Sequence, residues 1–372
     1  MRDIDIRIPL YEPSLGEEEL ANVVTAVRSG WVSSLGSFVP EFEREFAAFC
    51  GARFGIAVCN GTAALHLALL AAGVGEGDEV LVPSLTYVAT ANAVRYCGAA
   101  PVFVDADPAI WCMQAEGLDA MVTPRTRAIV PVHLYGHPCD MDAILELARR
   151  RGLAVIEDAA EAHGAEYRGR RVGALGAIGC FSFYGNKIIT TGEGGMCVTD
   201  DARLAERLRS LRDHAMDPER RYWHEQIGYS YRMTNLQAAL GVAQMGKIVN
   251  FVERKRRLAG WYAEMLAPLA AAGRIQLHPE APWAASVYWL YSVLVRAGRV
   301  SRDEARARLE ARGIETCPFF WPLHLLPPYA RGERMPAAED LGARGISLPS
   351  GADLDRNQVA RVVQALGEAL DG

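Results

Sequence analysis

The sequence predicts an α/β fold in which a large, mostly parallel sheet is followed by a smaller C-terminal α+β domain. Short apolar segments such as FGIAVC and LAVIEDAA alternate with helical patterns through the first half. Continuous apolar runs of this kind are typical of parallel strands that helices cover on both faces. The pattern changes near Lys247, where a long charged helix begins. The 372 residues also suffice for two domains of ~150 residues each.

The first strand is expected at Phe54–Cys59, and an Ala/Leu-rich helix, NGTAALHLALLAAG, follows it. Further strands are expected in GDEVLVPSLTY, PVFVDAD, RAIVPVHLYG, LAVIEDAA and GMCVTD, and helices in ATANAVRYCG and DMDAILELARRRG. Ligands bind such sheets at the carboxyl ends of the strands, so the loops after the strands should hold the chemistry.

Beyond residue 247 the long helix leads to the strand-like VYWLYSVLVRA and then to SRDEARARLEARG, whose Ser301 and Glu304 have the spacing of a capping box. An aromatic, Pro-rich loop, CPFFWPLHLLPPY, comes next. We therefore expect a large domain over residues 1–246, including an N-terminal arm, and a small domain over residues 247–372.

Composition excludes several classes of protein. The formal net charge of -6 argues against a broad cationic surface for nucleic acid or an anionic membrane. The N-terminal MRDIDIRIPL lacks the apolar core of a signal peptide, and no uncharged apolar run approaches the ~20 residues of a membrane span. Eight cysteines without a C-x-x-C pair indicate reduced thiols. We expect a cytoplasmic protein that handles small molecules, without a metal site.

The segment Asn60-Gly61-Thr62 lies between a predicted strand and a helix. Gly61 permits a tight turn, Thr62 offers a hydroxyl, and the first N–H groups of a helix attract an anion. This favours a phosphate site; a plain N-cap is the alternative.

Three carboxylates, Glu157, Asp158 and Glu161, lie at or just past the end of a buried strand. A carboxylate there needs a partner, and a protonated ring nitrogen such as that of pyridoxal phosphate is a good one. An Asp that caps a helix is the alternative. His163 could orient Asp158 from behind, or it could be a core histidine.

The most informative stretch is FSFYGNKIITTGEGGMCVTD, in which Lys187 stands between two apolar strands. A lysine in an apolar site has a lowered pKa and can form a Schiff base. Ser182 can donate to a phosphate, and the surrounding glycines would let the loop pass close to a cofactor: Gly185, Gly192, Gly194 and Gly195. A surface hairpin with a solvated lysine is the alternative.

Tyr87 follows a strand and could stack on a planar ring or belong to the core, and Asn235 could be a phosphate ligand or an N-cap. None of these signals is specific alone, but their occurrence together in this order, each after a predicted strand, is much more specific. A dinucleotide site is rejected, because GVGEGDE and GALGAIG lack the spacing and position of G-x-G-x-x-G.

Taken together, these stretches resemble the nucleotide-sugar aminotransferases of the DegT type, which are pyridoxal-phosphate transferases of fold type I. The resemblance spans essentially the whole chain, through GWVSSLGSFVPEFE, NGTAALHLAL, PSLTYVATANAV, PVHLYGHPCDMD, VIEDAAEAHGA, GYSYRMTNLQAALG, PFFWPLHLLPPY and SLPS. Within the family, NKIITTGEGGM, MDPERRYW and YRMTNLQAA resemble the subgroup of GDP-perosamine synthases. The large domain would then be the cofactor-binding domain.

The resemblance implies pyridoxal 5'-phosphate as the cofactor, with pyridoxamine 5'-phosphate as an intermediate. Lys187 would form the Schiff base and shuttle the proton, Asp158 would pair with the pyridine nitrogen, and Glu161 would lie near the ring hydroxyl. Tyr87 would stack on the ring. The other implied cofactor-binding residues are Gly61, Thr62, the Ala63 backbone, Ser182 and Asn186.

The resemblance also implies a homodimer with shared active sites, because Asn235 would reach the phosphate of the neighbouring subunit's cofactor. The substrates would be L-glutamate and a nucleotide-linked 4-keto-6-deoxy sugar, and the residues implied at the sugar are His324, Arg220, Arg221 and Tyr184. Trp321 and the pair His137-Pro138 depart from the subgroup's pattern. Another sugar specificity, or a dehydratase, therefore stays open, although a related dehydratase subgroup has histidine where this chain has Lys187. A cofactor-binding sensor is the alternative outside enzymes, disfavoured because no DNA-binding motif is visible.

Overall fold

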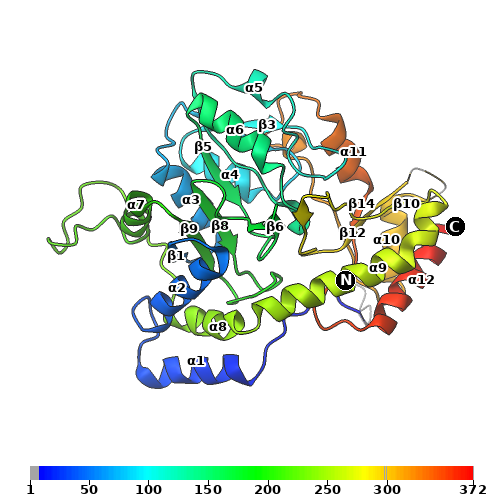
Figure 1. The fold of residues 1–372 in the computed structure, drawn as a ribbon, viewed down its shortest axis with the longest axis horizontal. Coiled ribbons are helices and arrows are strands. Elements are labelled where there is room, and N and C mark those ends of the chain that lie inside the picture. The colour runs from blue at the N-terminus through cyan, green and yellow to red at the C-terminus, as the bar shows by residue number, and fades with distance from the viewer. Residues whose placement is uncertain (1–7, 297, 299, 372) are drawn as a thin grey trace.

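The computed structural model describes residues 8–296, 298 and 300–371, and Figure 1 shows their arrangement. At the centre lies a seven-stranded sheet in the order β1-β9-β8-β5-β4-β2-β3. β9 runs antiparallel to both of its neighbours, and the other pairs are parallel. The predicted large, mostly parallel sheet is therefore confirmed. Its strands are β1 (Phe54–Val58), β2 (Glu79–Pro83), β3 (Ala100–Val104), β4 (Thr126–Ile129), β5 (Ala154–Asp158), β8 (Ile178–Ser182) and β9 (Gly195–Thr199).

Helices cover both faces of this sheet, which explains why its strands are mostly apolar. On one face, Phe46 of α2 (Phe38–Cys50) packs edge-on against Phe181 of β8, with ring centroids 4.8 Å apart. On the other, Cys197 of β9 donates its thiol to the Ala64 carbonyl of α3 (Gly61–Ala71), 3.4 Å away. The remaining helices of this part are α1 (Glu17–Ser29), α4 (Ala89–Tyr96), α5 (Leu118–Met121), α6 (Met141–Arg151), α7 (Ala202–Arg212) and α8 (Asn235–Met245).

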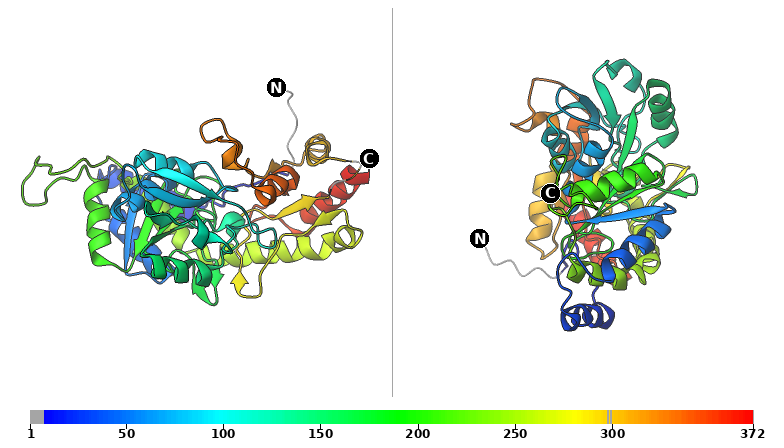
Figure 2. Two further views of the ribbon diagram at one scale, coloured as in Figure 1. Left: turned by 90° about the horizontal axis from the view of Figure 1, so that it is seen from above. Right: turned by 90° about the vertical axis from the view of Figure 1, so that its left-hand side faces the viewer.

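The C-terminal part has its own antiparallel sheet, β10-β12-β14-β13, reached along the long helix α9 (Ile248–Ala271) (Figure 2). A second apolar core lies here, formed by Ile8 with α9, the sheet, α10 and α12. The elements are β10 (Ile275–Gln276), β12 (Ser292–Val295), α10 (Arg302–Glu310), β13 (Cys317–Pro318), α11 (Pro336–Arg344), β14 (Gly345–Ser347) and α12 (Arg356–Asp371), with the 3₁₀ turns η1 (Leu134–Gly136) and η2 (Leu323–Leu325). A three-stranded ribbon joins β11 (Ala284–Ala285), β6 (Glu166–Tyr167) and β7 (Arg170–Arg171).

The two cores are not separated cleanly by sequence position. Phe319, Leu323 and Leu341 pack into the large core, and the Leu323 N–H bonds to the Ser84 carbonyl after β2, 2.7 Å away. The domain boundary at residue 247 stays a prediction.

Two local expectations have different outcomes. The capping box of α10 is confirmed, because Ser301 accepts from the Glu304 N–H and Glu304 reaches back to Ser301. The strand expected across VYWLYSVLVRA begins only at Ser292. The residues before it form a turn that packs against the large core instead, with Tyr288 at a positive φ of 47°.

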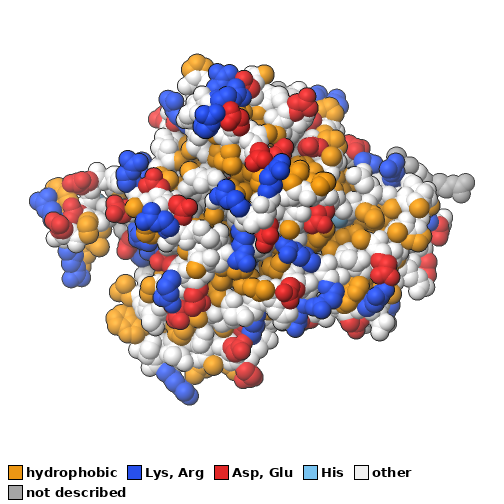
Figure 3. Space-filling view, in the orientation of Figure 1, with side chains coloured by type: hydrophobic (Ala, Val, Ile, Leu, Met, Phe, Trp, Pro, Cys, Tyr) orange, Lys and Arg blue, Asp and Glu red, His pale blue; other side chains and the backbone are white. Residues whose placement is uncertain are grey.

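The surface carries mixed charges: on the face drawn in Figure 3, basic and acidic side chains are interspersed. Among the helices described, none has the length and apolar character needed to cross a lipid bilayer.

Candidate active site

A cavity of about 460 Å³ lies at the carboxyl ends of the parallel strands, where the strand pattern predicted the chemistry. Its walls come from the loops after β1, β2, β4, β5 and β8 and from the C-terminal part. Most of the predicted site residues line it together: Gly61, Thr62, Tyr87, Asp158, Glu161, Ser182, Tyr184, Asn186 and Lys187.

The N-terminus of α3 forms one end of the cavity. Asn60 caps the helix by accepting the Ala63 N–H at 2.8 Å, so the N-cap alternative is confirmed. The Ala63 N–H is thus bonded to Asn60 in this structure, and its contact with a phosphate stays a prediction. Gly61 and Thr62 face the cavity instead. A Cβ on Gly61 would lie 2.8 Å from the Ser182 Cβ, so only glycine lets the helix start so close to Ser182.

The glycines after Lys187 serve the chain's own packing. A Cβ on Gly195 would lie 2.4 Å from the Asn60 carbonyl oxygen, and one on Gly194 would lie 2.2 Å from the Thr191 Oγ1. Gly194 and Gly195 thus let the loop pack closely against the rest of the chain, and the approach of the loop to a cofactor stays a prediction.

Asp158, the last residue of β5, points into the cavity and is buried. It accepts the Thr90 hydroxyl at 2.8 Å and the Ala160 N–H at 3.2 Å. Burial raises the pKa of Asp158, against the opposing effect of these bonds and of Lys187. A cation placed against this carboxylate would be strongly favoured, because it would stabilise the buried charge.

Lys187 and Glu161 form a buried pair, with Lys187 Nζ 3.8 Å from Glu161 Oε1. Glu161 also accepts the Tyr135 N–H at 2.8 Å. Burial raises the pKa of Glu161 to about 7, although Lys187 opposes the change. Burial likewise lowers the pKa of Lys187 against the attraction of Glu161 and Asp158. Desolvation therefore outweighs attraction for both groups: it raises the pKa of Glu161 and lowers the pKa of Lys187.

Glu157 and His163 lie outside the cavity. Glu157 accepts three loop N–H groups, from Gly173, Leu175 and Gly176 at 2.6–2.7 Å. Its role is to hold the loop before β8. His163 packs against Phe46, Phe181 and Phe183, and burial lowers its pKa to about 3. Among the described residues its ring nitrogens have no hydrogen-bond partner, so it is a core histidine and does not orient Asp158.

Tyr87 stands at the mouth of the cavity with 58% of its surface exposed, so the alternative of a core tyrosine is wrong. Its ring centroid is 5.7 Å from that of Phe320. Phe320, Trp289 and Thr90 also line the cavity, and sequence reasoning missed all three. Thr90 could have been found from its place after a predicted strand. Trp289 and Phe320 lie in apolar stretches typical of a core.

Asn235 does not line the cavity of its own chain. Its side chain accepts the Phe38 N–H at 3.1 Å and donates to the Trp31 carbonyl at 2.7 Å, which secures the segment before α2. The N-cap of α8 is Thr234, one residue earlier than the alternative had placed it.

Three other residues were expected at the sugar: His324, Arg220 and Arg221. None of them lines this cavity. His324 is buried on η2, with Nδ1 2.6 Å from the Ser84 Oγ and Nε2 3.3 Å from Glu339. Both of its ring nitrogens have partners within the chain, and the contact of His324 with the sugar stays a prediction. Arg220 and Arg221 are exposed on the loop that projects between α7 and α8 (Figure 1), over the rings of Trp223 and Tyr222.

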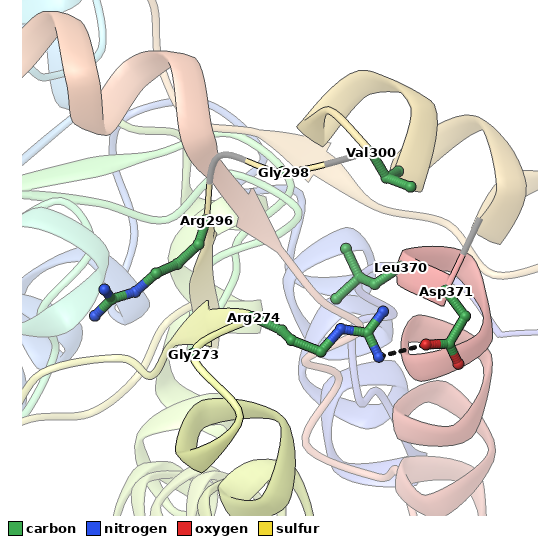
Figure 4. A pocket seen from close by; sticks show the side chains of 7 residues that line it. All are labelled: Gly273, Arg274, Arg296, Gly298, Val300, Leu370 and Asp371. Atoms are coloured by element: carbon green, nitrogen blue, oxygen red, sulfur yellow. Dashed lines mark ion pairs between the residues drawn. The ribbon is translucent and has the colours of Figure 1, made fainter.

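A second hollow, of about 380 Å³, lies between the ends of β10 and α12. Arg274 pairs with Asp371 across 2.6 Å at its edge, whereas the Arg296 side chain points away from them (Figure 4).

Comparison with known proteins identifies the family of the chain. Residues 13–367 match the DegT/DnrJ/EryC1/StrS aminotransferase family. The chain is 49% identical over 367 residues to a GDP-perosamine synthase of Caulobacter vibrioides, covering 98% of each chain. It is 42% identical over 373 residues to a dTDP-3-amino-3,4,6-trideoxy-alpha-D-glucose transaminase of Streptomyces venezuelae, covering 97% of this chain and 96% of that one.

Among solved structures, Streptomyces venezuelae DesV in complex with a ketimine intermediate superposes with a TM-score of 0.89 at 41% identity, covering 95% of each chain. The chain therefore belongs to the DegT/DnrJ/EryC1/StrS aminotransferase family.

Proposed function

We propose that this chain transfers the amino group of L-glutamate to the C4 keto group of a nucleotide-linked 4-keto-6-deoxy sugar. The substrate we favour is GDP-4-keto-6-deoxy-D-mannose, and the product is then GDP-perosamine. The observation that carries the proposal is the buried set of Lys187, Glu161 and Asp158 around one cavity. The choice of sugar is supported by the 49% identity to a GDP-perosamine synthase.

The residues present fit pyridoxal phosphate as the cofactor. Lys187 supplies an amine for its aldehyde, and Asp158 supplies a buried carboxylate for its ring nitrogen. The N-terminus of α3 at Gly61 and Thr62, with Ser182 beside it, suits a phosphate group because helix N-termini attract anions. Tyr87 is placed to cover a flat ring at the mouth. Bound pyridoxal phosphate supplies a carbon that takes up amino groups and a ring that delocalises an electron pair.

The chain's own groups then divide the work of proton transfer. Lys187 Nζ removes and returns a proton at the substrate carbon, and burial favours the neutral amine that this requires. Glu161, 3.8 Å away, stabilises the ammonium while Nζ carries the proton. Asp158 keeps the ring nitrogen charged, which favours removal of the proton from the substrate. Glutamate leaves as 2-oxoglutarate, and the sugar gains the amino group.

The alternative is transamination of another nucleotide sugar, linked to UDP or dTDP and bearing a C3 or C4 keto group. The 42% identity to a transaminase named for a dTDP-3-amino sugar supports it. His137 does not bear on this choice, because it bonds to the Pro138 carbonyl and the Ala281 N–H and does not line the cavity. Trp321 does not line the cavity either, but it is 68% exposed and directly follows Phe320, which does line it.

We propose in addition that the chain acts as a cytoplasmic homodimer with shared active sites. Apolar residues on α1 and in the segments on either side of it are exposed, and they would be covered by a second copy: Leu15, Leu20, Val27, Trp31, Val32 and Leu35. The projecting loop would carry Arg220 and Arg221 to a partner. The eight free cysteines suit a reducing compartment.

The decisive experiment is an assay with nitrogen-labelled L-glutamate against a panel of 4-keto and 3-keto nucleotide sugars. Mass and stereochemistry of each product are read out. Incorporation of the label at C4 of the GDP sugar is expected. Loss of a hydroxyl without incorporation would assign a dehydratase, and labelling only at C3 would assign the alternative substrate. Light-scattering mass in solution tests the dimer.

A further inference from the structure

The peptide that carries Lys187 is held by two aromatic residues from distant parts of the chain. Tyr11, in the N-terminal arm, donates its hydroxyl to the Lys187 carbonyl oxygen. Trp289, which precedes β12, donates its indole N–H to the Asn186 carbonyl oxygen at 2.7 Å. The two carbonyls belong to the peptide units on either side of the Lys187 Cα, so together the bonds fix the backbone from which the lysine side chain extends.

The Trp289 ring also faces the amine itself, with Lys187 Nζ 3.8 Å from the ring centroid. An ammonium at this distance from an indole face is attracted by the ring quadrupole, and the attraction grows where water is excluded. The Lys187 side chain is only 11% exposed. The charged groups that face Nζ from other segments are Glu161 and Asp158, so the ring adds a third, uncharged contact that favours the protonated amine.

A second buried lysine contacts both Trp289 and Tyr11. Lys255, in the middle of α9, is 1% exposed. Its Nζ donates to the carbonyls of Trp289, at 2.7 Å, and of Ser350, and lies 5.4 Å from the centroid of the Tyr11 ring. The main chain of Trp289 is thereby fixed, and its ring cannot leave Lys187 without a movement of the chain around it.

We propose that Trp289 is a positioning residue for Lys187: its ring face holds the ammonium against the cavity wall, and its N–H fixes the preceding peptide. Tyr11 assists on the following carbonyl, and Lys255 anchors the assembly. The inference rests on the proposed function for the meaning of Lys187, since it assigns to Trp289 the task of presenting that amine to the cofactor.

The test measures the reactivity of Lys187 in the full-length chain freed of cofactor. Trace labelling with acetic anhydride across a range of pH, followed by mass spectrometry of the Lys187 peptide, gives the pH at which half of the amine reacts. We expect this midpoint to fall in the order wild type, Trp289→Phe, Trp289→Leu, because tryptophan is the best ring for a cation and leucine has none. For Trp289→Leu the neutral-pH reactivity should rise by about 2- to 30-fold.

The matched control is Trp283→Leu. Trp283 belongs to the same segment and packs against Tyr167, with centroids 5.0 Å apart, but it does not line the cavity. The labelling midpoint of Lys187 in the Trp283→Leu variant should equal that in the wild type. Circular dichroism and thermal melting confirm that each variant is folded.

Unchanged labelling curves in both Trp289 variants would overturn the inference. Should Trp289→Leu not fold, Trp289→Phe decides, because it keeps a ring in the same space and must still lower the midpoint. The proposed function has a separate test: it is wrong if borohydride reduction of the wild type with pyridoxal phosphate leaves Lys187 unmodified.

Tyr11→Phe should speed release of the cofactor by about 2- to 10-fold, through loss of one hydrogen bond.

Discussion

The cavity at the strand ends and the hollow between β10 and α12 have comparable volumes, but their charged groups differ in burial. At the strand ends, Lys187, Glu161 and Asp158 are buried, and the pKa of each is displaced by that burial. Between β10 and α12, Arg274 pairs with Asp371, whose side chain is 72% exposed. Water screens the second pair, so that pair contributes little to the stability of the fold. The fold keeps the first three groups buried although burial disfavours their charged forms, and groups of this kind are candidates for catalysis.

Replacing Lys187 by Ala should have the largest effect. We expect loss of the yellow absorbance of bound pyridoxal phosphate and of turnover, since the loss of the proton shuttle alone removes ~10²–10⁴-fold in rate. Lys247→Ala is a matched control, because Lys247 pairs with Glu18 and Glu19 outside the cavity. Normal turnover by the Lys187→Ala chain would refute the mechanism.

Asp158→Asn comes next. The amide keeps the shape and the Thr90 bond but carries no charge for the ring nitrogen, so the rate should fall by ~10²–10³-fold, as when one charge-stabilising group is removed. Cofactor binding should persist, which separates this variant from Lys187→Ala. A rate equal to the wild type would mean that Asp158 does not face the ring nitrogen.

Glu161→Gln should change how stability depends on pH. With its pKa raised to about 7 in the folded state, Glu161 keeps its proton where the unfolded chain has lost it. The free energy of unfolding should therefore fall as pH rises from about 4.5 to 7, by up to roughly 3 kcal/mol. Urea unfolding of the chain freed of cofactor should show this decline, and the Gln variant should flatten it. Parallel curves for the two chains would contradict the assignment.

Arg274→Ala should have the smallest effect, because the ion pair with Asp371 is exposed. We expect less than ~1 kcal/mol of destabilisation and unchanged transaminase kinetics. A large loss of activity would show that the second hollow also serves function and would remove the contrast between the two regions.

The sequence predicted the sheet and the centre of the site because both depend on local patterns. Asp158 and Lys187 each follow an apolar strand, and parallel strands bring such positions to one edge. Trp289 and Tyr11 could not be found in this way, since their partners lie more than 100 residues away. The surroundings of His324 could not be predicted for a related reason: only the fold brings Ser84 and Glu339 to its two ring nitrogens.

The reversed direction of β9 has a consequence for how the site assembles. Because β9 returns beside β8, their pairing, Ser182 with Gly195, closes a short loop that carries Lys187. The pairing of β1 with β9 joins Val58 to Gly195, and only then does the N-terminus of α3 meet Ser182. Short loops close at lower entropic cost than long ones. We therefore expect the hairpin that carries Lys187 to form before the end of the cavity at α3 is completed.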